Sequence, residues 1–291
     1  MRWLAATTLG TSLLTGAAAQ AQAPQAAPQP PATQASVSQA TVSQVKLGYD
    51  TYAAGIEVMQ MQVALGLGPW TYQVDVNYHT TGLVGLFYRG SQVNAVRGVW
   101  QDDQAAPLEF SGDGVWRGRA RRTLIEYEHG QPQVRVLQPP QETEREPVPT
   151  ELQLHTMDTL SALAQLMRRV EREHSCDTSV RTYDGRRVLE VSARTGGSER
   201  LEPTDRSTFS GPTLRCDFEG RALAGFLIGD TNPEHRQPLR GSAWFAPAVP
   251  GAPTLPVRIA FQTRWFGLAT MYLTSAAPTV TPTEVARAPR P

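Results

Sequence analysis

Five histidines, two cysteines and scattered acidic side chains are the residues of this chain that could do chemistry. The histidines are His79, His129, His155, His174 and His235, and none belongs to an H-x-H or H-E-x-x-H pattern or to a Cys/His array at metal-ligand spacing. The chain also lacks a G-x-S-x-G nucleophile elbow and a phosphate-cradling loop. We therefore expect no catalytic residue, no metal site and no cofactor. A glycan or lipid hydrolase whose carboxylates meet only in the folded chain is the alternative.

Cys176 and Cys216 are the two cysteines, and they do not have the C-x-x-C spacing of a redox-active pair. In an oxidising compartment an isolated pair is most simply a structural disulfide. The pattern predicts that bond, with a redox pair or a metal site as alternatives.

The N-terminal residues predict export. Met1-Arg2 is a short positive region, residues 3–16 are mostly apolar or small, and Ala19-Gln20-Ala21 fits a cleavage site. We therefore expect a signal peptide at 1–21 and a periplasmic location, with an uncleaved anchor as the alternative. Residues 22–44 are rich in Gln, Ala and Pro and carry no charge, which predicts a disordered tether; 278–291 predicts a flexible tail. A single β-rich domain over 45–277 lies between them.

Composition narrows the choice of partner. The 27 Lys plus Arg balance the 27 Asp plus Glu, so the net charge is zero and nucleic acid is not expected as a partner. After the leader, no stretch is long and apolar enough to predict a membrane-spanning helix. We expect a monomer.

Period-2 alternation of apolar and polar residues dominates the chain and predicts antiparallel strands. Two of these strands lie at 56–65, with a bulge near Val58, and at 70–79, with a turn at 66–69 between them. Further strands are predicted at 45–52, 91–100, 107–111, 115–128, 133–138, 178–183, 186–192, 212–219, 221–228, 241–246, 255–264 and 268–274.

One amphipathic helix is predicted to begin after Asp158, because this N-cap residue precedes apolar residues at helical spacing; these are Leu160, Leu163, Ala164, Met167 and Val170. Asp184-Gly185 predicts a two-residue type I′ hairpin turn, which is an architectural feature. The predicted fold is mainly β: a strongly curved antiparallel sheet, forming a half-barrel or open barrel, with this helix packed on it.

Apolar residues in two places could bind a ligand. Trp70, Tyr72 and Tyr78 share one face of a strand, where they could line a groove or fill the protein's own core. Leu83, Leu86 and Phe87 stand in a Gly-punctuated stretch that could form the mouth of a hydrophobic cavity. The same stretch also fits an irregular strand at a corner of the sheet, with its apolar residues in the core.

Arg117, Arg119 and Arg121 recur at period 2 and form a candidate row of anion contacts for lipid headgroups, phosphates or glycan carboxylates. The alternative is an ordinary solvated face that is neutralised by acids such as Glu126 and Glu128.

In order and spacing, segments across nearly all of 45–277 resemble the exported bacterial proteins of domain of unknown function 3108. These segments are Tyr78–Gly85, Pro107–Phe110 before Trp116, Asp158 with Cys176 after its helix, Tyr183–Arg187, Cys216, Leu223–Phe226, and Pro256–Ile259 leading to Gly267. The resemblance implies an export signal and a β-rich domain, and it implies no assigned reaction.

Two hypotheses of function follow. The first is a non-catalytic binding or carrier module for a hydrophobic ligand, a lipid or acyl chain, with the concave face of the sheet as an apolar groove and the helix as its wall. The second is an assembly or scaffold factor that binds another envelope protein through an exposed strand edge.

Overall fold

A computed structural model describes residues 44–87, 89–263 and 267–279. The predicted signal peptide, nearly all of the predicted tether and most of the predicted tail lie outside these residues. Thr279, which was expected to belong to the tail, is the last residue of a strand, and Gln44, which was expected to belong to the tether, is the first residue of another.

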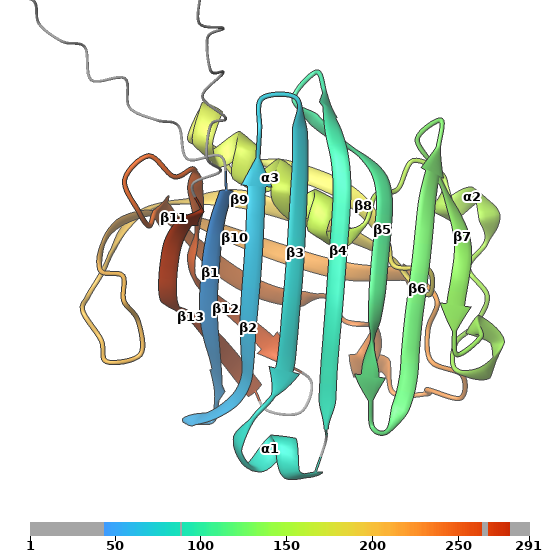
Figure 1. Ribbon diagram of the computed structural model, residues 1–291. Helices are drawn as coiled ribbons and strands as arrows, with labels where there is room; N and C mark the ends of the chain where they lie inside the picture. The colour runs from blue at the N-terminus through green and yellow to red at the C-terminus, as the bar shows by residue number, and fades with distance from the viewer. Residues whose placement is uncertain (1–43, 88, 264–266, 280–291) are drawn as a thin grey trace, which may run out of the picture. The chain divides into compact units, whose positions relative to one another are not determined.

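Thirteen strands form one sheet in which every pair of neighbours is antiparallel (Figure 1). The order is β7-β6-β5-β4-β3-β2-β1-β13-β12-β11-β10-β9-β8, so β7 and β8 are the edges. The strands are β1 (Gln44–Ala53), β2 (Ile56–Leu67), β3 (Thr71–Thr80), β4 (Gly90–Gln101), β5 (Gln104–Trp116), β6 (Arg119–Glu128), β7 (Gln131–Gln138), β8 (Thr178–Tyr183), β9 (Val188–Leu201), β10 (Gly211–Ala224), β11 (Leu239–Pro247), β12 (Thr254–Thr263) and β13 (Gly267–Thr279).

The predicted amphipathic helix is α3 (Thr159–Glu173), and it lies inside the curve of the sheet. It contacts β3, β4 and β5 on one side and β8 and β12 on the other. Figure 1 shows α3 between the strands in front and those that run behind them. The predicted fold, a curved and nearly closed antiparallel sheet with this helix packed on it, is confirmed. Two shorter helices, α1 (Gly82–Phe87) and α2 (Thr150–Gln153), were not predicted.

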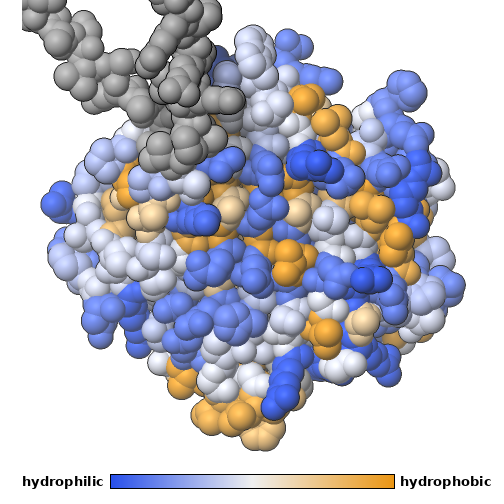
Figure 2. All heavy atoms as spheres, in the orientation of Figure 1, coloured by the Kyte–Doolittle hydropathy of each residue, from blue (hydrophilic) through white to orange (hydrophobic). Residues whose placement is uncertain are grey.

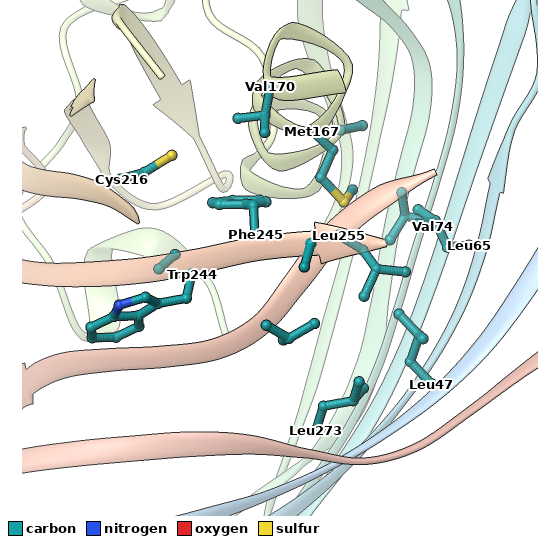
Figure 3. Close-up of a cluster of buried hydrophobic side chains, with 14 of the residues drawn as sticks. Leu47, Leu65, Val74, Met167, Val170, Cys216, Trp244, Phe245, Leu255 and Leu273 are labelled. Carbon is teal, nitrogen blue, oxygen red and sulfur yellow. The ribbon is translucent and has the colours of Figure 1, made fainter. Parts of the chain in front are cut away.

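The core forms where α3 meets the concave face of the sheet. Met167 and Val170 of α3 are buried among Phe245, Leu255 and Val74, which come from three different strands (Figure 3). Each large apolar side chain taken fully out of water contributes about 1.5–3 kcal/mol, so this contact provides much of the driving force for curving the sheet around the helix. This part of the concave face is filled by the protein's own side chains.

A buried hydrogen-bonded chain fixes the start of α3. Asp158 caps the helix by accepting bonds from Ser161 N (2.9 Å) and Ser161 Oγ (2.5 Å). Ser161 Oγ lies 2.7 Å from the hydroxyl of Tyr72 on β3. Since Asp158 and Ser161 are fully buried, this polar chain ties the helix to the sheet at one defined position.

The disulfide between Cys176 and Cys216 is present, as predicted. Cys176 lies just before β8 and Cys216 lies in β10, so the bond links the connection after α3 to the third strand from the β8 edge. Both cysteines are fully buried.

The segment that connects the edge strands β7 and β8, together with the β8–β9 loop, nearly closes the sheet. Met157 pairs with the β8 edge through Met157 N to Arg181 O (3.1 Å) and Tyr183 N to Met157 O (2.8 Å). The β8–β9 loop approaches the inner face of β6 and β7: a Cβ added at Gly185 would lie 3.1 Å from Leu137 and 3.3 Å from Thr123. The sheet therefore nearly closes by loop packing, without direct pairing of β7 with β8.

The strand register confirms one predicted detail and corrects another. Met59 pairs with Thr51 and Glu57 with Tyr52, which leaves Val58 as the predicted bulge. The expected strands at 212–219 and 221–228 are a single strand, β10, in which Gly220 keeps its ladder partners.

The expected strands at 107–111 and 115–128 are in fact β5 and β6, separated by the turn Arg117-Gly118. Both turn residues have positive φ, 51° and 75°, which is the type I′ geometry, but Arg does not signal such a turn as Asn or Asp would.

The type I′ prediction at Asp184-Gly185 was wrong. Gly185 has a positive φ of 84°, and Asp184 is not among the positive-φ residues. The loop spans residues 184–187, and Asp184 Oδ1 accepts bonds from Arg186 N (2.9 Å) and Arg187 N (2.8 Å). The side chain of Asp184 therefore organises a longer turn, which is the other way in which Asp favours turns.

Candidate functional site

One end of the sheet, which we call the α1 end, comprises α1, the β1–β2 turn and the β5–β6 turn. Hydrogen bonds join the chain to neighbouring elements both before and after α1. Thr81 N donates to Val58 O (3.0 Å) and Thr81 Oγ1 to Glu57 Oε1 (2.9 Å), which joins the start of α1 to β2. After the helix, Arg117 N donates to Arg89 O (3.1 Å), which joins the chain to the β5–β6 turn.

Glycines form the side of α1 that faces the sheet. A Cβ at Gly82 would lie 2.8 Å from Glu57 O, and one at Gly85 would lie 2.9 Å from Thr80 O. Gly82 also has a positive φ of 56°. These two positions let the backbone of the helix approach the strands closely. As a result, its larger side chains point away from the sheet, the reverse of an ordinary amphipathic helix.

The apolar side chains of α1 are exposed. Leu83, Leu86 and Phe87 are 61%, 69% and 79% accessible to solvent, and no residue of α1 is buried. Figure 2 shows a hydrophobic patch at the position that α1 occupies in Figure 1. The sequence had left two readings open for this stretch, and the irregular strand with its apolar residues in the core is wrong. A compact exposed apolar patch of this kind is typical of an interaction surface.

Arginines flank this patch. Arg89 follows α1, and Arg117 and Arg119 stand at the β5–β6 turn that is bonded to the backbone of Arg89. All three are exposed. The apolar set at 83–87 and two members of the predicted arginine row, Arg117 and Arg119, therefore meet at one end of the sheet.

The predicted arginine row is not a single strand face. Arg117 lies in the turn, while Arg119 and Arg121 lie on β6 opposite Trp116 and Gly114 of β5. Arg121 is partly buried and forms a bidentate pair with Glu144, at 2.6 and 3.0 Å. Glu126 and Glu128, which were expected to neutralise the row, both pair with Arg135 of β7 instead.

The three aromatic candidates separate. Tyr72 belongs to the core and to the Asp158 network. Trp70, 78% exposed, lies in the β2–β3 turn at the opposite end from α1. Tyr78 is partly buried near the α1 end of β3, where burial raises the pKa of its hydroxyl while Arg187 and Arg121 act to lower it. Of these three aromatic residues, only Tyr78 lies near an arginine of the predicted row, Arg121.

A polar cavity of about 790 Å³ lies elsewhere, between α3, the β4–β5 turn and the β8 edge. Asp103 of that turn pairs with Arg168, at 2.8 Å, and with Arg172 of the helix. Ser179 and Arg181 of β8 line the opposite wall. Charged groups dominate this cavity, so it does not resemble the apolar groove expected from the sequence.

Among residues 44–87, 89–263 and 267–279, no group of His, Cys, Asp and Glu could hold a metal ion. In the same part of the chain, no helix is long and apolar enough to cross a membrane.

Sequence reasoning missed a group of charged side chains, one buried and the others partly buried, near the gap between the sheet edges. Arg121 of β6 meets Glu144 from the chain after β7 and Arg186 from the β8–β9 loop. Arg145 and Arg187 lie in the same region. These residues come from three distant segments and share no spacing, so no sequence signal could have revealed them as a group.

Comparison with known proteins places the chain by family. No curated protein matches it significantly in sequence. Among solved structures, it is similar to the beta-barrel-like protein of domain of unknown function DUF1849 from Brucella abortus, with 10% identity and a TM-score of 0.47 over 83% of this chain and 100% of that one. The family model for proteins of unknown function DUF3108 matches residues 46–274, which is most of the sequence and nearly all of the sheet. The chain is therefore a member of the DUF3108 family.

Proposed function

We propose that the protein is an exported, non-catalytic binding module for a hydrophobic ligand, a lipid, and that it contacts this ligand with the α1 end of the sheet. The observation that carries the proposal is the outward-facing apolar set on α1, whose two glycines lie close against the strands and which is flanked by exposed arginines. Apolar side chains that enter the acyl region beside cations that meet anionic headgroups are the usual elements of interfacial lipid binding.

The energy available suits reversible binding. Full burial of a Leu or Phe side chain is worth about 1.5–3 kcal/mol, so three such residues, each roughly two-thirds exposed, could contribute about 3–6 kcal/mol. Each arginine close to an anionic surface adds about 1 kcal/mol at low salt. This total is comparable to that of one short acyl anchor, which binds membranes reversibly.

Export to the periplasm is part of the proposal. It is supported by the leader-like sequence at 1–21 and by a buried disulfide, which suits an oxidising compartment.

Vesicle co-sedimentation tests the lipid contact. The purified protein should pellet with vesicles of phosphatidylglycerol and phosphatidylcholine, and less with phosphatidylcholine alone. The triple variant Leu83→Ser/Leu86→Ser/Phe87→Ser should lower partitioning by at least about 100-fold, which corresponds to the lower end of that range, roughly 3 kcal/mol. Trp70→Ser is the matched control, because Trp70 is equally exposed at the other end. If the triple variant bound as well as the wild type, the proposal would be wrong.

A second candidate function, recognition of another envelope protein, is supported by the β8 edge beside the polar cavity. Within the part of the chain that the structure describes, Met157 bonds to this edge at Arg181 and Tyr183. The backbone at Ser179 faces the cavity region and could add an extended segment of a partner. Ser179→Pro would remove a donor from this edge, so a partner captured from envelope extract by the wild type should be lost with this variant.

A further inference from the structure

Four guanidinium groups and two carboxylates gather where the sheet nearly closes, and we call this group the closure cluster. Arg121 of β6 and Arg186 of the β8–β9 loop share Glu144, whose Oε2 lies 3.0 Å from Arg121 Nη1 and 3.7 Å from Arg186 Nη1. Arg187 pairs with Asp184 at 2.7 Å. Arg145 Nη1 donates to Gly225 O (2.8 Å).

The charges of the closure cluster do not balance. Its four positive groups face two negative ones, Glu144 and Asp184, which leaves an excess of two positive charges. The consequence is visible at Arg145, where burial and the neighbouring Arg187 lower the pKa to about 10. Burial and Arg121 likewise lower the pKa of Arg186. The local potential therefore favours an anion.

Within the described residues, Arg186 has more buried donors without a hydrogen-bond partner than any other member of the closure cluster. It is only 7% exposed, and both of its Nη atoms are buried without a hydrogen-bond partner within the described residues; the same holds for Nε of Arg121. The backbone of Arg186 is fixed, since Gln141 Nε2 donates to its carbonyl (2.8 Å) and Asp184 accepts its N–H. A buried guanidinium that is held in place and whose Nη donors make no hydrogen bond is the arrangement that recognises planar or tetrahedral oxyanions.

We propose that Arg186 and Arg121 form a buried binding site for an oxyanion, a phosphate or carboxylate group, on the inner side of the closing gap. The anion would bridge the free donors of the two arginines and offset the excess charge of the closure cluster. Glu144 would hold both guanidiniums from the other side. This site differs from the exposed patch on α1 and does not depend on lipid contact there.

The site lies within the polar part of the sheet's inner face. Arg121 points inward beside Gly114, and Arg121 and Arg187 both act on the hydroxyl of Tyr78. A free phosphate or the headgroup of a lipid that contacts the α1 end could supply the oxyanion, since both present the same oxygens. The experiment distinguishes these two sources.

Isothermal titration calorimetry with inorganic phosphate is the first test. The wild type should bind phosphate, and Arg186→Met, which removes the guanidinium and keeps an unbranched stem, should weaken binding by about tenfold or more. Arg215→Met is the matched control, because Arg215 is a partly exposed arginine on β10 that is fully paired with Asp217 and lies outside the closure cluster. Arg121→Lys provides a second variant that keeps the charge and loses the fork, and it too should bind more weakly.

A second titration uses dihexanoyl phosphatidic acid, a soluble lipid phosphate. Binding that is tighter than that of inorganic phosphate and that depends on both Arg186 and the apolar set on α1 would identify a lipid headgroup as the source. Equal binding of the two probes, dependent on Arg186 alone, would identify a free phosphate. Absence of binding by either probe, or equal affinities for wild type and Arg186→Met with both folded by circular dichroism, would overturn the proposal. Loss of vesicle binding by the α1 variant with phosphate binding retained would separate this site from the proposed function.

Discussion

Replacement of Asp158 separates the role of its side chain as a helix cap from the cost of its buried charge. Asp158→Ala removes the acceptors of Ser161 N and Ser161 Oγ, while the Ser161 hydroxyl can still bond to Tyr72. Loss of an N-cap costs about 1 kcal/mol, and a buried donor left without a partner costs about 1–3 kcal/mol. We therefore expect Asp158→Ala to lower the free energy of unfolding by about 2–4 kcal/mol.

Asp158→Asn keeps the shape and the cap and removes the charge. Its carbonyl can accept from Ser161 N, and its amide can donate to Ser161 Oγ, which then donates to Tyr72. The variant should stay within about 1 kcal/mol of the wild type at neutral pH. Urea unfolding followed by tryptophan fluorescence measures both variants. Equal stabilities of the Ala and Asn variants would refute the capping argument.

The pH dependence gives an independent check. Burial raises the folded-state pKa of Asp158 above its ordinary value of 3.8, despite its hydrogen bonds with Ser161. Between these two pKa values the folded state binds more protons than the unfolded state, so this group lowers the stability as the pH rises. Relative to Asp158→Asn, the wild type should therefore lose stability as the pH rises from about 3.8 through the folded pKa. An increase in its relative stability over that range would contradict the assignment.

Three further predictions concern the same framework. Cys176→Ser should lower the free energy of unfolding by about 4 kcal/mol, because the disulfide spans 40 residues and constrains the unfolded chain; the double variant with Cys216→Ser should match the single one in thermal unfolding, and unequal effects would indicate separate roles for the two thiols. Glu144→Gln should lower the free energy of unfolding, measured in urea, by about 2–4 kcal/mol, because the substitution leaves Arg121 and Arg186 without their shared carboxylate. An unchanged urea midpoint would contradict that role. The triple serine variant of α1 should change the melting temperature by less than about 3 °C, because exposed side chains contribute little to folding, and a large loss would mean that α1 packs elsewhere.

Sequence patterning was most informative where one physical signal dominated. Alternation located the sheet and even the bulge at Val58, and Asp158 marked the start of α3 because a cap and an apolar stripe coincided. It failed at Arg117-Gly118, where an arginine adopts positive φ, and at Gly220, which looks like a turn residue but stays within a strand. In both places strand pairing overrode the local preference of the residue.

The candidate site was only partly predictable. The apolar residues of α1 were recognised as unusual, but their exposure depends on Gly82 and Gly85 approaching particular carbonyl oxygens of the neighbouring strands, which no spacing encodes. The closure cluster depends on the final curvature of the sheet, because Arg121, Glu144 and Arg186 meet only when its edges approach. Contacts that form only in the folded chain set both features.

Hydrogen exchange with mass spectrometry, in the presence and absence of phosphatidylglycerol-containing vesicles, tests the central claim most directly. Lipid contact at the α1 end predicts slower exchange in residues 82–87 and around Arg117–Arg119, with no change at the β2–β3 turn that carries Trp70. Protection at the β2–β3 turn instead, or equal exchange everywhere under conditions where the protein pellets with vesicles, would contradict the account.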